Sequence, residues 1–168
     1  MRAFASFVLL QLGWFACVLG AAHSRPWLGP LVVALALSLH VVRQASRGRE
    51  ALVLGLTVAM GFVVDSALLR AGVLGMASGS LLSPPWLVAL WPNFAAATAP
   101  GGLLVALRER RLAAALVSAV GGALAYDAGA RLGPIAIEAP RVVGLLVIAL
   151  VWSAVLPLLF ALRARAGA

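Results

Sequence analysis

Residues 142–162 read VVGLLVIALVWSAVLPLLFAL and contain no charged side chain. A helix that crosses a bilayer needs about 20 consecutive, mostly apolar residues, so this stretch is long enough to span one. The rest of the chain has the same character, because 64% of its 168 residues are hydrophobic and only 11% are charged. Its mean hydropathy is +1.08. Soluble domains have about 25% charged residues, so the composition excludes an ordinary water-soluble protein.

Five further apolar stretches precede this one, separated by charged residues or by Pro and Gly. The six stretches are residues 4–22, 28–42, 51–69, 86–107, 112–130 and 142–162. Six spans of about 20 residues take up most of the chain and leave no room for a folded domain outside the bilayer. We therefore expect an all-α, polytopic membrane protein, with residues 1–168 forming one transmembrane domain of six helices.

The basic residues indicate orientation in the membrane. The net charge is +8, and all 13 basic residues are arginines. If the N-terminus is cytoplasmic, nine of them fall in cytoplasmic segments and four in outer segments. Short cytoplasmic loops are enriched in Lys and Arg. We therefore expect a multi-pass protein of a bacterial inner (plasma) membrane with both termini cytoplasmic. Membrane lipids are its expected partners, nucleic acid is not, and a membrane-protein partner or a homo-oligomer is left open.

Two parts of the chain resemble each other. Ser24-Arg25-Pro26-Trp27-Leu28 and Ser83-Pro84-Pro85-Trp86-Leu87 share four of five residues, and an arginine precedes both Asp65 and Asp127 by 16 residues. Either a parallel duplication of a helical hairpin accounts for these matches, or they arise by chance in a sequence rich in Ala, Leu and Gly. A rise of about 24 Å over 16 helical residues places both aspartates near the outer edge of the bilayer core. Trp27 and Trp86 are expected to be anchors at the membrane surface.

The two aspartates are the first candidates for chemistry, because ionisable groups within spans are costly and need partners. Asp127 can pair with Arg131 at i, i+4. Arg70 lies on a different face of the helix from Asp65, whose candidate partners are Arg131, His23 and Tyr126. The two carboxylates form either a structural clasp or a binding or catalytic pocket, and they would share a proton if they lay close together.

Other polar groups fall within the predicted spans. Gln11 lies one turn before Trp14, and the fourth span contains Asn93 and the helix breaker Pro100-Gly101-Gly102, which predicts a kink or an unwound segment. Small residues at intervals of four in the fifth span predict the close approach of another helix. They are Gly121, Ala125, Gly129 and Gly133. The candidate ligand-binding residues are Gln11, Trp14, Asn93, Tyr126, Arg131, Arg70 and His23. We expect no metal site and no cofactor, because His23 and His40 are predicted at opposite faces and Cys17 is the only cysteine.

Recognisable motifs lie at Gln11–Gly20, Gly61 with Asp65, Trp91–Phe94, Gly121-Gly122, Tyr126, Gly129 and Arg131–Gly133. Together they resemble a family of small bacterial inner-membrane proteins, domain-of-unknown-function family 2878. The chain departs from the family at Ala99–Gly102, where the resemblance implies a more polar stretch, and at Ala123–Ala125, where it implies Pro and Ser. The resemblance implies fold and location but no activity. Members look to be often encoded near lipid-modifying genes, which slightly favours lipid metabolism.

Three functions follow from these observations. The leading hypothesis is a non-enzymatic membrane protein that binds a lipid-like ligand or a membrane partner at a polar layer near the outer leaflet. The second is a lipid-modifying enzyme that uses Asp65 and Asp127 as acid and base. The third is a small proton-coupled transporter, which requires polar groups to continue through the inner half of the bundle.

Overall fold

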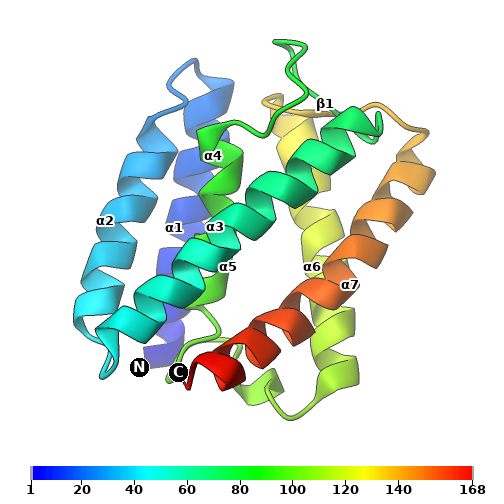
Figure 1. Cartoon of the computed structure of the whole chain (residues 1–168). Coiled ribbons are helices and arrows are strands. Elements are labelled where there is room, and N and C mark those ends of the chain that lie inside the picture. The colour runs from blue at the N-terminus through cyan, green and yellow to red at the C-terminus, as the bar shows by residue number, and fades with distance from the viewer. Residues whose placement is uncertain (1, 168) are drawn as a thin grey trace.

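The structure is a computed structural model that describes residues 2–167, and it is a bundle of helices with one short β-ladder (Figure 1). The helices are α1 (Arg2–Ala22), α2 (Leu28–Val42), α3 (Arg47–Arg70), α4 (Pro85–Val88), α5 (Leu90–Ala96), the 3-10 turn η1 (Val105–Leu107), α6 (Arg111–Leu132) and α7 (Arg141–Ala166). Both ends of the chain lie at the same end of the bundle. Four of these helices are long and apolar enough to cross a membrane: α1, α3, α6 and α7.

Most of the predicted helices are present. The stretch 28–42 matches α2, which is apolar but shorter than the four long helices. The stretch 142–162 lies within α7, and α3 begins at Arg47, four residues before the predicted start at residue 51. The structure therefore confirms a predominantly helical fold in which α3 includes one more turn than the hydropathy pattern indicated.

The predicted span 86–107 is not one continuous helix, and the break predicted at Pro100-Gly101-Gly102 is present. Pro85 occupies the first turn of α4, where a missing N–H costs nothing, and α5 ends at Ala96. The chain then turns through Gly101, whose φ of +79° favours glycine. The N–H of Leu104 donates to the carbonyl of Ala97 over 2.9 Å, which folds the segment back on itself. The fourth segment is thus a half-length helix followed by irregular chain.

The β-ladder joins the two loops at the end of the bundle opposite the termini. In it β1 (Leu74–Gly75) pairs antiparallel with β2 (Ala136–Ile137), so that Leu74 lies opposite Ile137. These loops follow α3 and α6 and were both predicted on the outer side. Their pairing places the C-terminal ends of α3 and α6 at one end of the molecule (Figure 1).

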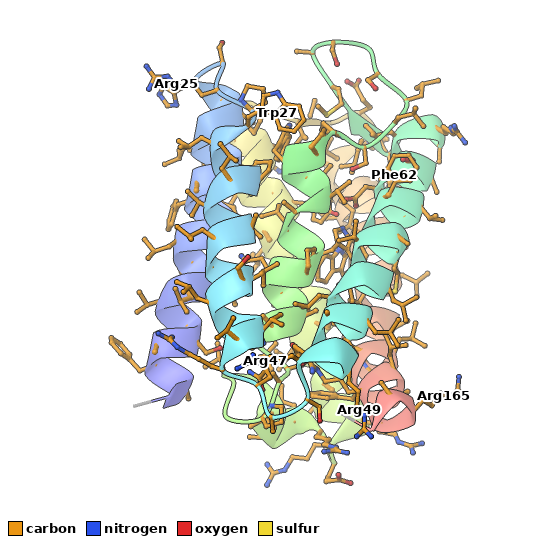
Figure 2. All side chains as sticks on the ribbon, turned by 60° about the vertical axis from the view of Figure 1, so that its left-hand side comes forward. Arg25, Trp27, Arg47, Arg49, Phe62 and Arg165 are labelled. Carbon is orange, nitrogen blue, oxygen red and sulfur yellow. The ribbon has the colours of Figure 1, made fainter. Side chains whose placement is uncertain are left out.

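The surface departs from the usual soluble pattern, and the mainly apolar interior also holds a few charged groups. Large apolar side chains such as Leu31, Leu35 and Leu150 are exposed, whereas polar or charged ones such as Glu50 and Asp65 are buried. Figure 2 shows arginines gathered at the two ends of the bundle and apolar side chains along its flank. Such a surface suits hydrocarbon at the flank and water at the ends.

Candidate functional site

A pocket of about 220 Å³ extends from the middle of the bundle toward the β-ladder. Its walls come from α1, α4, α5, α6 and α7, together with Ile135 from the loop after α6. Aromatic rings dominate the walls, and the polar groups among them are Gln11, Asn93, Ser118 and Tyr126 together with the indole nitrogens. From Val117 to Gly129 the pocket follows α6 over 13 residues, or about 18 Å of helix.

Helix α6 lines the pocket with two parallel rows of residues. One row is Ser118, Gly122 and Tyr126, which are buried, and the other is Val117, Gly121, Ala125 and Gly129. Nothing lies within 4 Å of a Cβ built on Gly121. The prediction that the small-residue stripe lets another helix approach is therefore wrong for Gly121, because the space beside it is the pocket. The close helix contact uses Gly122 instead, where Trp152 of α7 packs directly on the backbone.

Asp65 lies directly behind the pocket wall and is fully buried. Trp91 donates its indole N–H to Oδ2 of Asp65 over 2.9 Å, and the Tyr126 hydroxyl donates to Oδ1. Gly61, one turn before Asp65, gives room for the Trp91 ring, since a Cβ there would overlap it. The carboxylate therefore fixes the orientation of two aromatic side chains that face the pocket, and Tyr126 is the one predicted partner of Asp65 that the structure confirms.

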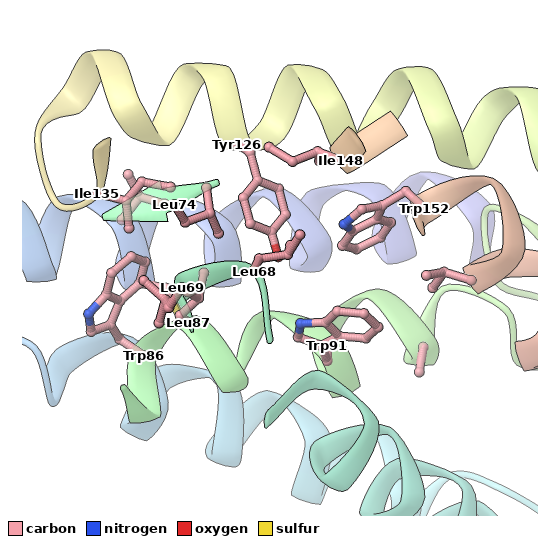
Figure 3. Packing of buried hydrophobic residues seen from close by; sticks show 14 of the residues in the cluster. Leu68, Leu69, Leu74, Trp86, Leu87, Trp91, Tyr126, Ile135, Ile148 and Trp152 are labelled. Atoms are coloured by element: carbon pink, nitrogen blue, oxygen red, sulfur yellow. The ribbon is translucent and has the colours of Figure 1, made fainter. Parts of the chain in front are cut away.

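Trp152 is the centre of the aromatic cluster. Its ring centroid lies 5.0 Å from that of Trp91, 5.3 Å from that of Phe94 and 6.1 Å from that of Tyr126. The contacts with Phe94 and Tyr126 are edge-to-face, a favourable arrangement of aromatic quadrupoles. Figure 3 shows the indole nitrogen of Trp152 directed toward Tyr126. The pocket is thus built on a cluster of mutually packed rings.

Four of the predicted ligand-binding residues meet in this pocket: Gln11, Trp14, Asn93 and Tyr126. Asn93 also holds α5 against α1, because its side-chain amide donates to the carbonyl of Leu10 over 2.9 Å. The amide packs against Gly13, where a Cβ would collide with it. Helices α1, α5 and α6 therefore bring polar side chains to one pocket.

The other predicted residues lie elsewhere. Asp127 is at the surface, where it pairs with Arg131 over 2.9 Å, as predicted, and also with Arg141 at the start of α7. Its partners and those of Asp65 are different, so no hydrogen bond or shared partner joins the two carboxylates. His23 is exposed and bonds the carbonyl of Leu19 over 2.9 Å, and Arg70 is exposed at the end of α3.

A second polar cluster, at the opposite end of the bundle, was missed in the sequence. Glu50 is 2% exposed and Arg163 is 3% exposed. The guanidinium of Arg163 donates to both carboxylate oxygens of Glu50, over 2.6 and 2.9 Å, and His40 contacts the same carboxylate over 2.8 Å. The guanidinium also donates to the Thr98 hydroxyl over 2.6 Å and to the Ala95 carbonyl over 3.0 Å. Arg163 thus caps the end of the half-length helix α5, where a positive charge is favourable.

Two further expectations need correction. Trp86 is 3% exposed and belongs to the core, unlike Trp27, which is 63% exposed and fits a surface anchor. Arg163 was counted among the cytoplasmic arginines that set orientation, but it is neutralised inside the bundle. Within residues 2–167, no three His, Cys, Asp or Glu side chains lie close enough to hold a metal ion.

The sequence contained a signal for the pocket that hydropathy did not reveal. Ser118, Gly122 and Tyr126 follow one another at intervals of four, which places a hydroxyl, a backbone surface and a phenol on one helix face. Trp152 had no such signal, since its role depends on the packing of α7 against α6.

The comparisons with known proteins yield one match. The model of a family described as "Protein of unknown function (DUF2878)" matches residues 3–158, in agreement with the resemblance seen in the sequence. No curated protein and no solved structure matches the chain.

Proposed function

The chain belongs to the DUF2878 family of unknown function, and we propose that it is a multi-pass membrane protein that binds a lipid-like ligand in its aromatic pocket. Insertion into a bilayer is supported by the four long apolar helices and by the exposed apolar flank. In this proposal α2 and the segment from Pro85 to Arg110 also cross the bilayer, which gives six passes.

The proposed orientation places both termini on the cytoplasmic side of a bacterial inner membrane. It is supported by the arginines at the end of the bundle that holds the termini, among them Arg47, Arg49 and Arg165 in Figure 2. Excess basic residues favour the cytoplasmic side. The pocket and the β-ladder then lie toward the outer leaflet.

The observation that carries the binding proposal is the lateral position of the pocket mouth. Val117 and Gly121 of α6 line the pocket and are exposed on the flank, and Gln11 and Trp14 of α1 line it and are partly exposed. A mouth at this level of the bundle opens to the hydrocarbon core rather than to water. A ligand entering there must itself be soluble in hydrocarbon, which is the property of a lipid-like molecule.

The size of the pocket limits how much of a ligand it encloses. A cavity of about 150 Å³ is sufficient for benzene, and pockets for drug-sized molecules begin at about 300 Å³. At about 220 Å³ the pocket holds a ring, a small polar group or a short chain segment. The remainder of a lipid would extend through the mouth between α1 and α6.

The proposal is tested with a phospholipid that carries a photoreactive diazirine in its acyl chain. The protein is reconstituted in vesicles of phosphatidylethanolamine and phosphatidylglycerol that contain this probe, irradiated, and mapped by mass spectrometry. Gly121→Leu fills the pocket. It should lower labelling of the pocket-lining peptides of α1 and α6 several-fold and leave labelling of the other exposed faces unchanged.

Gly55→Leu is the matched control. Gly55 is exposed in α3, outside the pocket, and has open space around it, so the same change should leave labelling as in the wild-type protein. Equal labelling of all exposed helix faces, with no effect of Gly121→Leu, would contradict ligand binding in the pocket.

The two alternative functions have less support. A paired-aspartate enzyme needs both carboxylates at one cavity, whereas Asp65 bonds two aromatic side chains and Asp127 pairs with arginines at the surface. A proton-coupled transporter needs polar groups in the inner half, and the Glu50 cluster supplies them. However, Glu50 is held there by Arg163 and His40 as a structural cap of α5.

A further inference from the structure

Two buried polar atoms in the pocket wall make no hydrogen bond. They are Oγ of Ser118 and Nε1 of Trp152, and neither makes a hydrogen bond among residues 2–167, although Nε1 is directed toward Tyr126 on the same wall. Both side chains are more than nine-tenths buried and both line the pocket. Buried polar groups in native proteins almost always have a hydrogen-bond partner. Two unpaired groups on one cavity therefore indicate that a bound molecule supplies the partner.

Both unpaired groups can donate a hydrogen bond. An indole N–H can only donate a hydrogen bond, and a serine hydroxyl donates or accepts. Serine in a helix often donates to the carbonyl four residues earlier, but the Ser118 hydroxyl makes no such bond. Its proton is therefore available to a ligand, and a ligand atom that satisfies both groups must be an acceptor.

The pocket wall is also free of formal charge. No Arg, Lys, His, Asp or Glu is among the described residues that line it. The Asp65 carboxylate lies behind the wall and already accepts from Trp91 and Tyr126. An anionic headgroup would find no cation in the pocket and would face a buried carboxylate. A cationic headgroup would leave the indole N–H without an acceptor.

Resting on the proposed function, we infer that the pocket selects an uncharged carbonyl group carried on an apolar body, held by the Ser118 hydroxyl and the Trp152 indole N–H. The ester carbonyl of a neutral acylglycerol and the ring carbonyl of an isoprenoid quinone both present this chemistry. The aromatic walls formed by Trp91, Phe94 and Trp152 suit a flat ester group or a ring.

The test is competition against the photoreactive phospholipid with compounds that share one alkyl chain. They are a monoacylglycerol, the matching fatty acid, the matching alkyltrimethylammonium and the matching alkane, and a short-chain quinone forms a fifth arm. The monoacylglycerol or the quinone should displace pocket labelling at the lowest concentration, and which of the two does so identifies the carbonyl source. The fatty acid and the ammonium compound should compete no better than the alkane.

Two variants link selectivity to the named atoms. Ser118→Ala and Trp152→Phe each remove one donor while keeping most of the packing, and each should weaken the carbonyl competitor by roughly two- to tenfold, the equivalent of one hydrogen bond. The alkane should compete as before. Ser153→Ala, which removes an exposed hydroxyl bonded to Leu150, is the control and should change nothing.

The outcomes separate this inference from the proposed function. If the fatty acid or the ammonium compound competes best, or if both donor variants bind the carbonyl compound like wild type, the inference is wrong while ligand binding stands. If pocket labelling is not displaced by any compound and Gly121→Leu has no effect, the proposed function fails as well.

Discussion

Arg163→Met removes a buried cation and keeps an unbranched side chain with a high helix propensity. In the wild-type protein this guanidinium makes four hydrogen bonds, two to Glu50 and one each to Thr98 and Ala95. The variant leaves the Glu50 carboxylate buried with His40 as its remaining contact and leaves the end of α5 without its cap. Removing one partner of a buried ion pair costs about 3–5 kcal/mol, so we expect a loss in that range.

The assay is reversible unfolding in mixed micelles of SDS and a mild detergent, followed by tryptophan fluorescence and circular dichroism. Arg165→Met is the matched control, because Arg165 is exposed two residues further along α7. It should change the free energy of unfolding by less than about 0.5 kcal/mol, as is usual for surface positions.

A double-mutant cycle shows whether the loss comes from the pair itself. Glu50→Gln should also destabilise, because it leaves Arg163 charged and buried. The double variant should cost less than the two single changes added together, by about 2 kcal/mol or more, since it leaves no unpaired charge. If Arg163→Met costs less than about 1 kcal/mol, which is typical of an exposed ion pair, the structural role assigned to this cluster is wrong.

Three other predictions concern the core and the topology. Gly61→Ala places a methyl group in the indole ring that packs on it and should cost about 1–3 kcal/mol in the same unfolding assay, whereas Gly55→Ala, in open space, should stabilise by about 0.5–1 kcal/mol. Tyr126→Phe removes one of two donors to a buried carboxylate, and should cost about 1–3 kcal/mol with a shift in tryptophan emission; unchanged stability would argue that the phenol does not hold the carboxylate. For topology, Ser80→Cys should react with an impermeant maleimide in intact cells and Arg110→Cys only after permeabilisation, and the reverse pattern would overturn the proposed orientation.

Hydropathy predicted the helices because the partition of a segment between water and a bilayer depends on its composition summed over many residues. The stretch 142–162 is apolar on every face, so the helical region could be placed there without knowing what it packs against. In the segment from residue 86 the break was predicted from Pro100-Gly101-Gly102, but the hydropathy pattern did not show that α5 ends at Ala96, which depends on the turn at Gly101 and on a distant arginine. These act through local geometry and tertiary contact, which an average over hydropathy does not contain.

Contacts in the candidate site were predictable only where the spacing within one helix determines which side chains meet. Asp127 with Arg131 follows from helical spacing, and the pairing is present. By contrast, Glu50 was assigned to a loop because the predicted span began at residue 51, yet α3 starts at Arg47 and turns Glu50 inward. The burial of Trp86 and the fixed orientation of Tyr126 depend on which helices become neighbours, and that information is absent from any single segment.

The cap on α5 has a consequence for the order of assembly during synthesis. The carbonyl of Ala95 and the hydroxyl of Thr98 receive their donor from Arg163, which is translated 65 residues after Thr98. The N–H and the hydroxyl of Thr98 already donate to the Ala95 carbonyl, so α7 adds a positive charge at the end of α5 and a hydrogen bond to the Thr98 oxygen. The buried cluster of Glu50, Thr98 and Arg163 is therefore completed only once α7 has been made and inserted beside α3 and α5.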